Sequence, residues 1–379
     1  MSSVMCYKDA IQKALNFLET QRYRIDRSVQ AQCSLWEGSK PDQQPLLLSC
    51  ALPPELEDLF PELDYREIRA SSENMLVHGL VPALRAAAGG RESVPSVRAN
   101  MGCGVFPTLL GVRQEVFTDK MPWVRKHAPR EHLLGMDAGD IVLSEEFKQG
   151  LEHMAAMSVV LADSPCRIFP MDLQGPFDTA HIAYGDRIFY EIHDDPGFLH
   201  HLLELSCEAI ILGMEACLEY MPGDMVPHYN SLVIPRSLGG IKISEDTSTL
   251  LSREQIQEFV VPYTQRILEH FGGGYIHYCG KNPGLMEEIL HLPQVRGLNL
   301  GNPEMHDMED VLGRCRDRGL LYYGWIPRKE NEGHHAFFQR CLQASCKNGL
   351  CRILLQVQGG WEERQDIAEA WEGSVMACG

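Results

Sequence analysis

The chain lacks long apolar runs and is poor in basic residues, and each absence narrows what the protein can be. No stretch approaches the roughly eighteen apolar residues that a membrane-spanning helix needs. Lys and Arg number 34 against 52 Asp and Glu, which gives a formal net charge of −18. Because phosphate groups are bound by clustered cations, this balance argues against nucleic acid and anionic membranes as partners.

The sequence also lacks a leader pattern and a disulfide framework. The first residues, from Met1 to Ala10, show no basic segment followed by an apolar run, so we expect no signal peptide. The 13 cysteines are odd in number and scattered without framework spacing, which is typical of a reducing compartment. We therefore expect a cytoplasmic protein without disulfides, whose 379 residues suffice for one large domain or two modest ones.

What the chain does contain is an alternation of short apolar runs with helical patterns, beginning near Val94. This alternation is typical of a parallel sheet, and eight runs with helix-length connections favour a (β/α)8 TIM barrel in the α/β class. We thus predict a barrel over residues 94–379 and an N-terminal helical cap over residues 1–93. The link at residues 235–239 is too short for a helix and departs from a strict barrel. The eight runs are residues 94–101, 167–173, 225–232, 240–244, 275–279, 295–300, 320–326 and 351–357.

Two of the predicted helices have clear start signals. Asp195 followed by Pro196 combines an N-cap with proline in the first turn, and predicts a helix of about twenty residues. Ser252 with Gln255 has the spacing of a capping box. Pro262 lies inside the pattern that follows and is expected to kink that helix.

In a (β/α)8 barrel the functional residues lie at the carboxyl ends of the strands, and this rule selects a ring of polar side chains. Each member taken singly could equally be a loop residue that caps a helix. Together they predict one pocket with many hydrogen-bonding groups. The ring consists of Arg98, Asn100, Cys103, Asp172, Gln174, His228, Asn230, Glu245, Asp246, His277, Cys279, Asn299, Asn302, Glu304, Trp325, Gln356 and Gln358.

Within the ring, His277 and Cys279 carry the most specific signal. Residues two apart on a strand project to the same side, so one cation could bind both side chains. Imidazole and thiolate together favour zinc over magnesium or calcium. No third and fourth Cys or His lie nearby in the sequence, which indicates an incomplete and thus catalytic ligand set. The alternative is a buried cysteine beside a hydrogen-bonded histidine, without metal.

At these residues the chain resembles the uroporphyrinogen decarboxylase superfamily, from about Glu73 to the C-terminus. That superfamily consists of (β/α)8 barrels and includes zinc-dependent corrinoid methyltransferases that act on thiols such as coenzyme M. The HxCG stretch resembles the zinc motif of the methyltransferase branch. The residues that carry the resemblance are Gly175-Pro176-Phe177, Thr179-Ala180, Ile243-Ser244-Glu245-Asp246, Leu251-Ser252, Pro262-Tyr263 and His277-Tyr278-Cys279-Gly280.

The resemblance implies a zinc ion held by His277 and Cys279, and a methyl donor carried on a partner corrinoid protein. The methyltransferase branch has a further cysteine at the end of the eighth strand, where this chain has Gln356 and Gln358. Cys351 opens that strand and lies about 20 Å from its end, at about 3.3 Å per residue.

A carboxylate must therefore complete the ligand set. We expect Asp246 as the third ligand in preference to Glu245, since run four neighbours run five in barrel order. His228, on run three, is the next candidate, because it is one strand further from run five in barrel order.

These observations lead us to expect a zinc-dependent methyltransferase with a small-molecule substrate. The expected catalytic residues are Asp172, Asp246 and His228, and the expected substrate-binding residues are Arg98, Gln174, Asn230, Asn299, Trp325 and Gln356.

Two alternatives stay open. The first is a metal-free decarboxylase of a tetrapyrrole-like or other acidic substrate, with Asp172 or Asp246 stabilising the intermediate and Arg98 and Arg236 binding carboxylates. The decarboxylase branch has an Arg-rich segment near its N-terminus, which has no counterpart before Val94. The second alternative is a non-enzymatic barrel that binds a small ligand.

Overall fold

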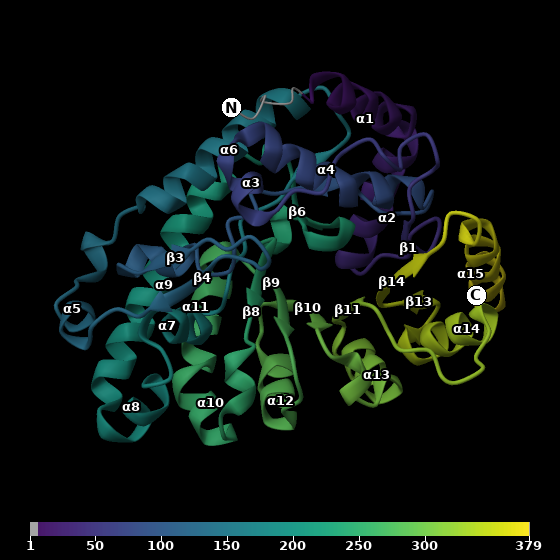
Figure 1. Cartoon of the computed structure of the whole chain (residues 1–379). Coiled ribbons are helices and arrows are strands. Elements are labelled where there is room, and N and C mark those ends of the chain that lie inside the picture. Colours follow the sequence, from purple (N-terminus) through teal and green to yellow (C-terminus); the bar gives the residue numbers. More distant parts are fainter. Residues whose placement is uncertain (1–6, 379) are drawn as a thin grey trace.

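The computed structural model describes residues 7–378, apart from the side chains of Asn230 and Cys378. It shows an α/β fold in which helices surround a parallel sheet (Figure 1). The sheet has six parallel strands in the order β1-β14-β11-β10-β9-β8. These strands are β1 (Leu46–Cys50), β8 (Ile241–Ser244), β9 (Gly274–Tyr278), β10 (Val295–Leu300), β11 (Leu321–Gly324) and β14 (Ile353–Gly359).

A separate parallel pair is formed by β2 (Ser96–Val97) and β5 (Arg167–Ile168). Isolated hydrogen bonds connect the flanks of this pair to both edges of the sheet. The Glu92 N–H donates to the Leu46 carbonyl at 3.1 Å, and the Gly175 N–H donates to the Ser244 carbonyl at 2.7 Å. Among the described residues, strand pairing is interrupted between β1 and β2 and between β5 and β8. The strands therefore do not form a continuously hydrogen-bonded closed barrel.

Helices occupy most of the connections between the parallel strands, and their predicted start signals are present. Asp195 caps its helix by accepting the Phe198 N–H at 3.0 Å, and Ser252 forms the capping box with Gln255. The expected kink is a break at Val260, with Pro262 in the first turn of the next helix. The helices are α1 (Lys8–Thr20), α2 (Arg22–Trp36), α3 (Tyr65–Ala70), α4 (Ser72–Ala88), α5 (Arg130–Leu134), α6 (Glu145–Leu161), α7 (Pro176–Tyr184), α8 (Ile188–Asp194), α9 (Pro196–Leu218), α10 (Arg253–Phe259), α11 (Val261–Phe271), α12 (Pro283–His291), α13 (Met308–Arg318), α14 (His334–Ser345) and α15 (Arg364–Cys378).

Two predictions about the strands were wrong. The N-terminal region is not purely helical, because the apolar run at residues 46–50 is β1 and pairs with β14. The run at residues 225–232 is not a parallel strand. Its first half is β6 (Met225–His228), which turns through Tyr229–Ser231 and pairs antiparallel with β7 (Leu232–Pro235). Because β7 runs antiparallel to β6, it returns the chain to the end of the sheet from which β6 started. The short link after residue 235 therefore needs no crossover helix.

The β6–β7 hairpin closes the amino end of the sheet. Leu232 and Ile234 pack in a buried cluster with Trp36 of α2 and Tyr275 at the start of β9. Two short hairpins lie outside this layer, β3 (Arg113–Glu115) with β4 (Trp123–Lys126) and β12 (Cys346–Lys347) with β13 (Leu350–Cys351).

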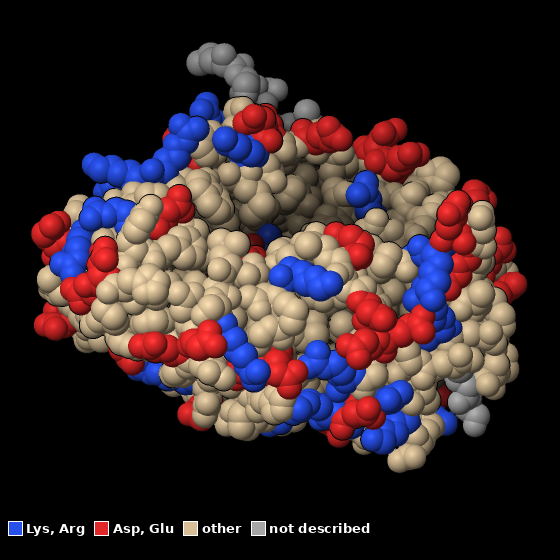
Figure 2. Space-filling model, turned by 90° about the horizontal axis from the view of Figure 1, so that it is seen from below, with Lys and Arg blue, Asp and Glu red and all other residues tan. Residues whose placement is uncertain are grey.

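The face seen in Figure 2 is hollowed near its centre, and both acidic and basic atoms are visible in the hollow. Among residues 7–378, no helix combines the length and apolar character needed to cross a membrane.

Candidate metal centre and adjoining cavity

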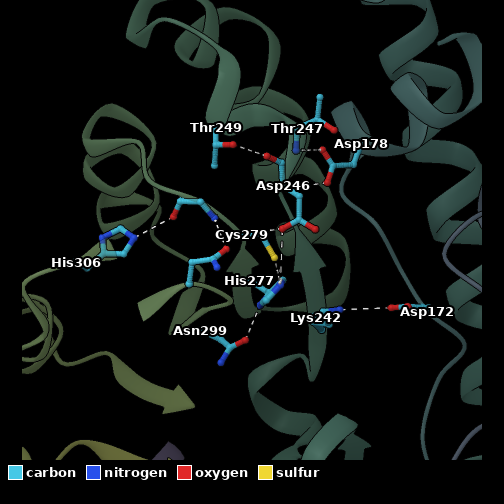
Figure 3. Close-up of polar contacts among 12 residues, drawn as sticks. Asp172, Asp178, Lys242, Asp246, Thr247, Thr249, His277, Cys279, Asn299 and His306 are labelled. Atoms are coloured by element: carbon cyan, nitrogen blue, oxygen red, sulfur yellow. Dashed lines mark hydrogen bonds and ion pairs between the residues drawn. The ribbon is translucent and has the colours of Figure 1, made fainter. Parts of the chain in front are cut away.

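Three potential metal ligands converge where β8 and β9 end (Figure 3). One ligand atom each from Asp246, His277 and Cys279 lies within 4.8 Å of the other two. The His277 Nε2 atom is 3.7 Å from Asp246 Oδ1 and 3.6 Å from Cys279 Sγ. The shared direction of His277 and Cys279 follows from the two-residue period of β9.

Backbone packing leaves room for this cluster. β8 and β9 are parallel neighbours with Ser244 opposite His277, so Asp246 follows at the same end of the sheet. Gly301 follows β10 on the other side, and a Cβ atom there would lie 2.5 Å from Cys279 Sγ. A larger residue at position 301 would therefore displace the thiol.

Asn299 of β10 sets the orientation of the His277 ring. Its Nδ2 donates to the Tyr323 carbonyl at 2.5 Å, which fixes the amide so that Oδ1 faces His277. Because that oxygen can only accept, the His277 Nδ1–H donates to it at 2.5 Å. The lone pair of Nε2 then points at Asp246 and Cys279, as is typical of a metal-ligating histidine supported by a hydrogen-bonded neighbour.

Asp178, on α7, is a functional residue that the sequence reasoning missed. Its buried carboxylate accepts the backbone N–H groups of Asp246 and Thr247, both at 2.7 Å. Asp246 Oδ1 in turn accepts the Cys279 N–H at 2.6 Å. Asp178 thus holds the turn that presents Asp246. It lies directly between Phe177 and Thr179 in the segment that carries the family resemblance, which was the available signal.

Burial dominates the electrostatics of the cluster. Burial lowers the pKa of His277, and the nearby Lys242 lowers it further, so the imidazole is neutral and able to bind a metal. Burial also raises the pKa of the Cys279 thiol to about 11, and the Asp246 carboxylate adds to this shift. A thiolate at Cys279 therefore requires a compensating positive charge, which a bound cation provides.

Glu245 points away from the cluster. It is fully buried and accepts hydrogen bonds from Thr264 at 2.6 Å and Ser248 at 2.8 Å. Burial raises its pKa to about 7. Burial, with the neighbouring charges of Glu245 and Asp246, also raises the pKa of Asp178. Of the two carboxylates considered for the third ligand, the structure brings only Asp246 to the cluster.

The donor set of the cluster fits zinc. One nitrogen, one sulfur and one carboxylate oxygen are ligands that zinc accepts, and three protein donors leave a fourth position for a substrate or water. The orientation of His277 supports a metal site independently of the types of donor atom. The hydrogen bond to Asn299 directs the lone pair of Nε2 toward the other two donors.

Beside the cluster, Asp172 lies between two cations. Its carboxylate is 3.3 Å from Arg98 and 3.5 Å from Lys242. Burial acts to raise the pKa of Asp172, but the charges of Arg98 and Lys242 outweigh burial, and the pKa is lowered. These three residues line a small cavity, and Arg98 also lines a larger one of about 380 Å³ that Gln356 and Gln358 reach. Lys242 was not anticipated, because it lies within a strand rather than at its end.

His228 does not lie at the carboxyl end of a parallel strand, where the sequence predicted it. His228 ends β6 in the antiparallel hairpin, so it enters from the floor rather than from the carboxyl end of a parallel strand. It is buried, and its Nε2 lies 2.7 Å from the Gly240 carbonyl. Burial lowers its pKa to about 3. His228 lines the floor of the small cavity and is not part of the metal cluster.

The remaining predicted residues are dispersed. Gln174 and Trp325 line neither of these two cavities, and Arg236 donates to the Met221 and Gly223 carbonyls instead of facing a substrate. Asn302 orders the loop after Cys279 by accepting the Gly280 N–H at 3.0 Å. The side chain of Asn230 is outside the described residues, Cys103 is absent from the cluster, and Glu304 pairs with Asn302.

No protein-family model matches the chain, and no curated protein sequence is significantly similar to it. The fold and the cluster at the ends of β8 and β9 are thus the main evidence on function. In the described part of the chain, one set of nitrogen, sulfur and oxygen donors lies close enough together to bind a metal ion.

Proposed function

We propose that this protein is a zinc-dependent methyltransferase of the uroporphyrinogen decarboxylase-like group. The proposal rests first on the convergence of His277 Nε2, Cys279 Sγ and an Asp246 oxygen within 4.8 Å. The HxCG motif at His277 supports zinc, and the glutamine at position 356, in place of a cysteine, agrees with a carboxylate as third ligand. A carboxylate makes the site less thiolate-rich and more Lewis acidic than a site with two cysteines.

We further infer that the sheet and the β2–β5 pair together make a (β/α)8 barrel. Eight parallel strands follow one another in chain order, from β1 through β2, β5, β8, β9, β10 and β11 to β14. The hydrogen bonds from Glu92 to Leu46 and from Gly175 to Ser244 bring the unpaired edges together. The metal cluster then has the position typical of barrel enzymes, at the carboxyl ends of the strands.

In this proposal each residue of the site has a separate task. His277, Cys279 and Asp246 hold the ion, and Asn299 orients His277. When bound, zinc lowers the pKa of a substrate thiol, so that a thiolate is available at neutral pH to accept a methyl group from a partner corrinoid protein. Lys242 and Asp172 line the small cavity of about 20 Å³, and Arg98 connects it to the larger cavity of about 380 Å³, where the rest of the substrate binds.

Zinc stoichiometry combined with a methyl-transfer assay tests the proposal. We expect about one zinc per chain, lost in His277→Ala and in Cys279→Ser. His291→Ala removes an exposed histidine of α12 and is the matched control. Methyl transfer from free methylcobalamin to 2-mercaptoethanol should require zinc and both ligands. Full zinc retention by His277→Ala would reject the metal centre, whereas zinc binding without methyl transfer would reject only the reaction.

The Arg98–Asp172–Lys242 cluster supports a second candidate, a metal-free decarboxylase. Asp172 has a lowered pKa and stays ionised, so it could stabilise a cationic intermediate while Arg98 binds a substrate carboxylate. This function predicts CO₂ release from an acidic substrate that survives removal of metal by a chelator. It also predicts that Asp172→Asn abolishes activity while Cys279→Ser does not.

A further inference from the structure

Where β2, β5 and β8 meet, the part-buried side chains carry an excess of positive charge, with Arg98 after β2, Asp172 after β5 and Lys242 on β8. Arg98, Lys242 and Asp172 expose only 16, 22 and 17% of their side chains, and the one carboxylate is shared by the two cations. The residues lining the two cavities include no other Asp or Glu. Burial lowers the pKa of His228 to about 3, so it is neutral and adds no charge of either sign at pH 7. Two cations that share one carboxylate leave the lining of these cavities net positive, which favours binding of an anion here.

Of the two cations, Arg98 is the better placed to bind an anion. Its guanidinium lies 5.7 Å from the centre of the Phe169 ring and 5.5 Å from the centre of the Tyr229 ring. Contacts with two aromatic rings restrict the plane of the guanidinium. Its Nη1 already lies 3.3 Å from Asp172 and its Nη2 donates to Asn100 Oδ1 at 3.4 Å, so an oxyanion is bound through the remaining N–H groups. Arg98 lines both cavities, whereas Lys242 lines only the smaller one.

The larger cavity indicates the rest of the ligand. Its volume of about 380 Å³ lies within the range of sites for organic ligands and exceeds what a two- or three-carbon thiol fills. Apart from Arg98, its polar lining is mainly neutral hydrogen-bonding groups, including Ser49, Ser96, Asn100, Gln356 and Gln358. We propose that this cavity binds an extended polar acid, with its oxyanion on Arg98 and its hydroxyl or amide groups on Gln356 and Gln358. The proposal goes beyond the metal centre, because binding of the acid requires no metal.

A series of sugar acids and matched neutral polyols can probe the cavity in metal-free protein. Calorimetry with glycolate, glycerate and gluconate should show affinity rising with length, because each added hydroxyl meets the serine and amide lining. Ethylene glycol, glycerol and glucitol, which lack the carboxylate, should each bind about tenfold more weakly or worse. Equal binding of acids and polyols, or no saturable gluconate binding at millimolar concentrations, would overturn the proposal.

Two variants locate the oxyanion and the body of the ligand separately. Arg98→Gln should weaken gluconate binding about tenfold or more, whereas Arg236→Gln, the same change at the floor of the molecule, should leave it unchanged. Gln358→Ala should weaken gluconate binding but not glycolate binding, and serves if Arg98→Gln fails to fold. Unaltered gluconate affinity in both cavity variants would reject the site. Zinc content of Arg98→Gln, measured in parallel, should stay at the wild-type level, so failure of the metal centre and failure of this cavity give different results.

Discussion

The two sides of the site differ in how regularly their strands are paired. On one side, β8, β9 and β10 are continuous neighbours whose carboxyl ends pair regularly, and they place Asp246, His277 and Asn299 within hydrogen-bonding or ion-pair distance. On the other side, β2 and β5 form only a short pair, and the adjacent gap is occupied by the cavity that Arg98 lines.

This difference separates two kinds of chemistry. Regular pairing fixes ligand atoms to within a few tenths of an ångström, as a small cation requires. Interrupted pairing leaves volume between strands, as an organic ligand requires. We therefore expect changes on the β8–β10 side to alter metal affinity, and changes on the β2–β5 side to alter ligand binding with metal content unchanged.

The largest expected effect is loss of metal from Asp246→Ala. Removing a first ligand should weaken zinc binding by more than about 100-fold, beyond the 10- to 100-fold that is typical of changes behind the ligands. Asp246→Asn keeps an oxygen acceptor for the Cys279 N–H but removes the charge. Its zinc affinity should therefore lie between those of the wild type and Asp246→Ala. Competitive titration with a zinc chelator measures these affinities. Gln356→Ala on the cavity side is the control and should bind zinc normally. Full zinc retention in Asp246→Ala with a lowered melting temperature would mean that Asp246 only supports the turn.

Asn299→Ala should weaken zinc binding by about 10- to 100-fold, because the His277 ring loses the partner that fixes its tautomer and orientation. The side chain touches no ligand atom other than through His277, so this variant tests orientation alone. Asn299→Asp retains an acceptor for Nδ1–H but loses the donor to the Tyr323 carbonyl, so it should restore only part of the affinity. Asn74→Ala, on α4, is the matched control. Wild-type zinc affinity in Asn299→Ala, by the same titration, would contradict the assigned role.

The regular side of the molecule is also the side that could be predicted from the sequence. A period of two on β9 was sufficient to place His277 and Cys279 together, and the order of neighbouring strands was sufficient to select Glu245 and Asp246 as the nearest carboxylates. Both inferences needed only local geometry and one rule about strand ends.

The irregular side could not be predicted in this way. Leu46 to Leu48 form a short apolar run that does not differ from a buried helical segment, so β1 was missed. The hairpin at Tyr229 depends on Ser231 at φ +70°, a conformation that serine rarely signals. Lys242 was passed over because the rule considered only strand ends. Asp178 acts through backbone N–H groups of a distant segment, which sequence spacing does not reveal.

Asp178→Ala should destabilise the fold by about 2 kcal/mol, since two part-buried N–H groups lose their acceptor. The raised pKa of Asp178 shows that burial disfavours its carboxylate, so removing this group offsets part of the loss of stability. Because the turn then no longer presents Asp246, zinc affinity should also fall about tenfold. Denaturant unfolding and zinc titration measure the two effects. Asp195→Ala removes another carboxylate that accepts a backbone N–H, and should cost about 1 kcal/mol without changing zinc affinity. A stability loss in Asp178→Ala with unchanged zinc affinity would limit Asp178 to folding.

The smallest effect concerns His228, on the floor of the cavity side, and is seen only in acid. Its pKa falls from the ordinary value of 6.5 to about 3 because burial disfavours the imidazolium. Above pH 6.5 both the folded and the unfolded chain hold a neutral imidazole, so His228 adds no pH dependence there. As the pH falls below 6.5 the unfolded chain gains a proton that the folded chain refuses, so stability is lost throughout the window down to about pH 3.

For this group the loss should reach about 1.4 kcal/mol at pH 5.5. His228→Gln cannot titrate and keeps a donor for the Gly240 carbonyl, so its stability should fall less steeply between pH 7 and pH 5.5. Urea unfolding at both pH values gives the comparison, with His291→Gln on the surface as control. Parallel slopes for wild type and His228→Gln would show that His228 is protonated in the folded protein and that the floor of the cavity is charged. That outcome would add a second positive charge beneath Arg98 and strengthen the preference of the cavity for anions, while zinc affinity on the β8–β10 side should be the same in both proteins.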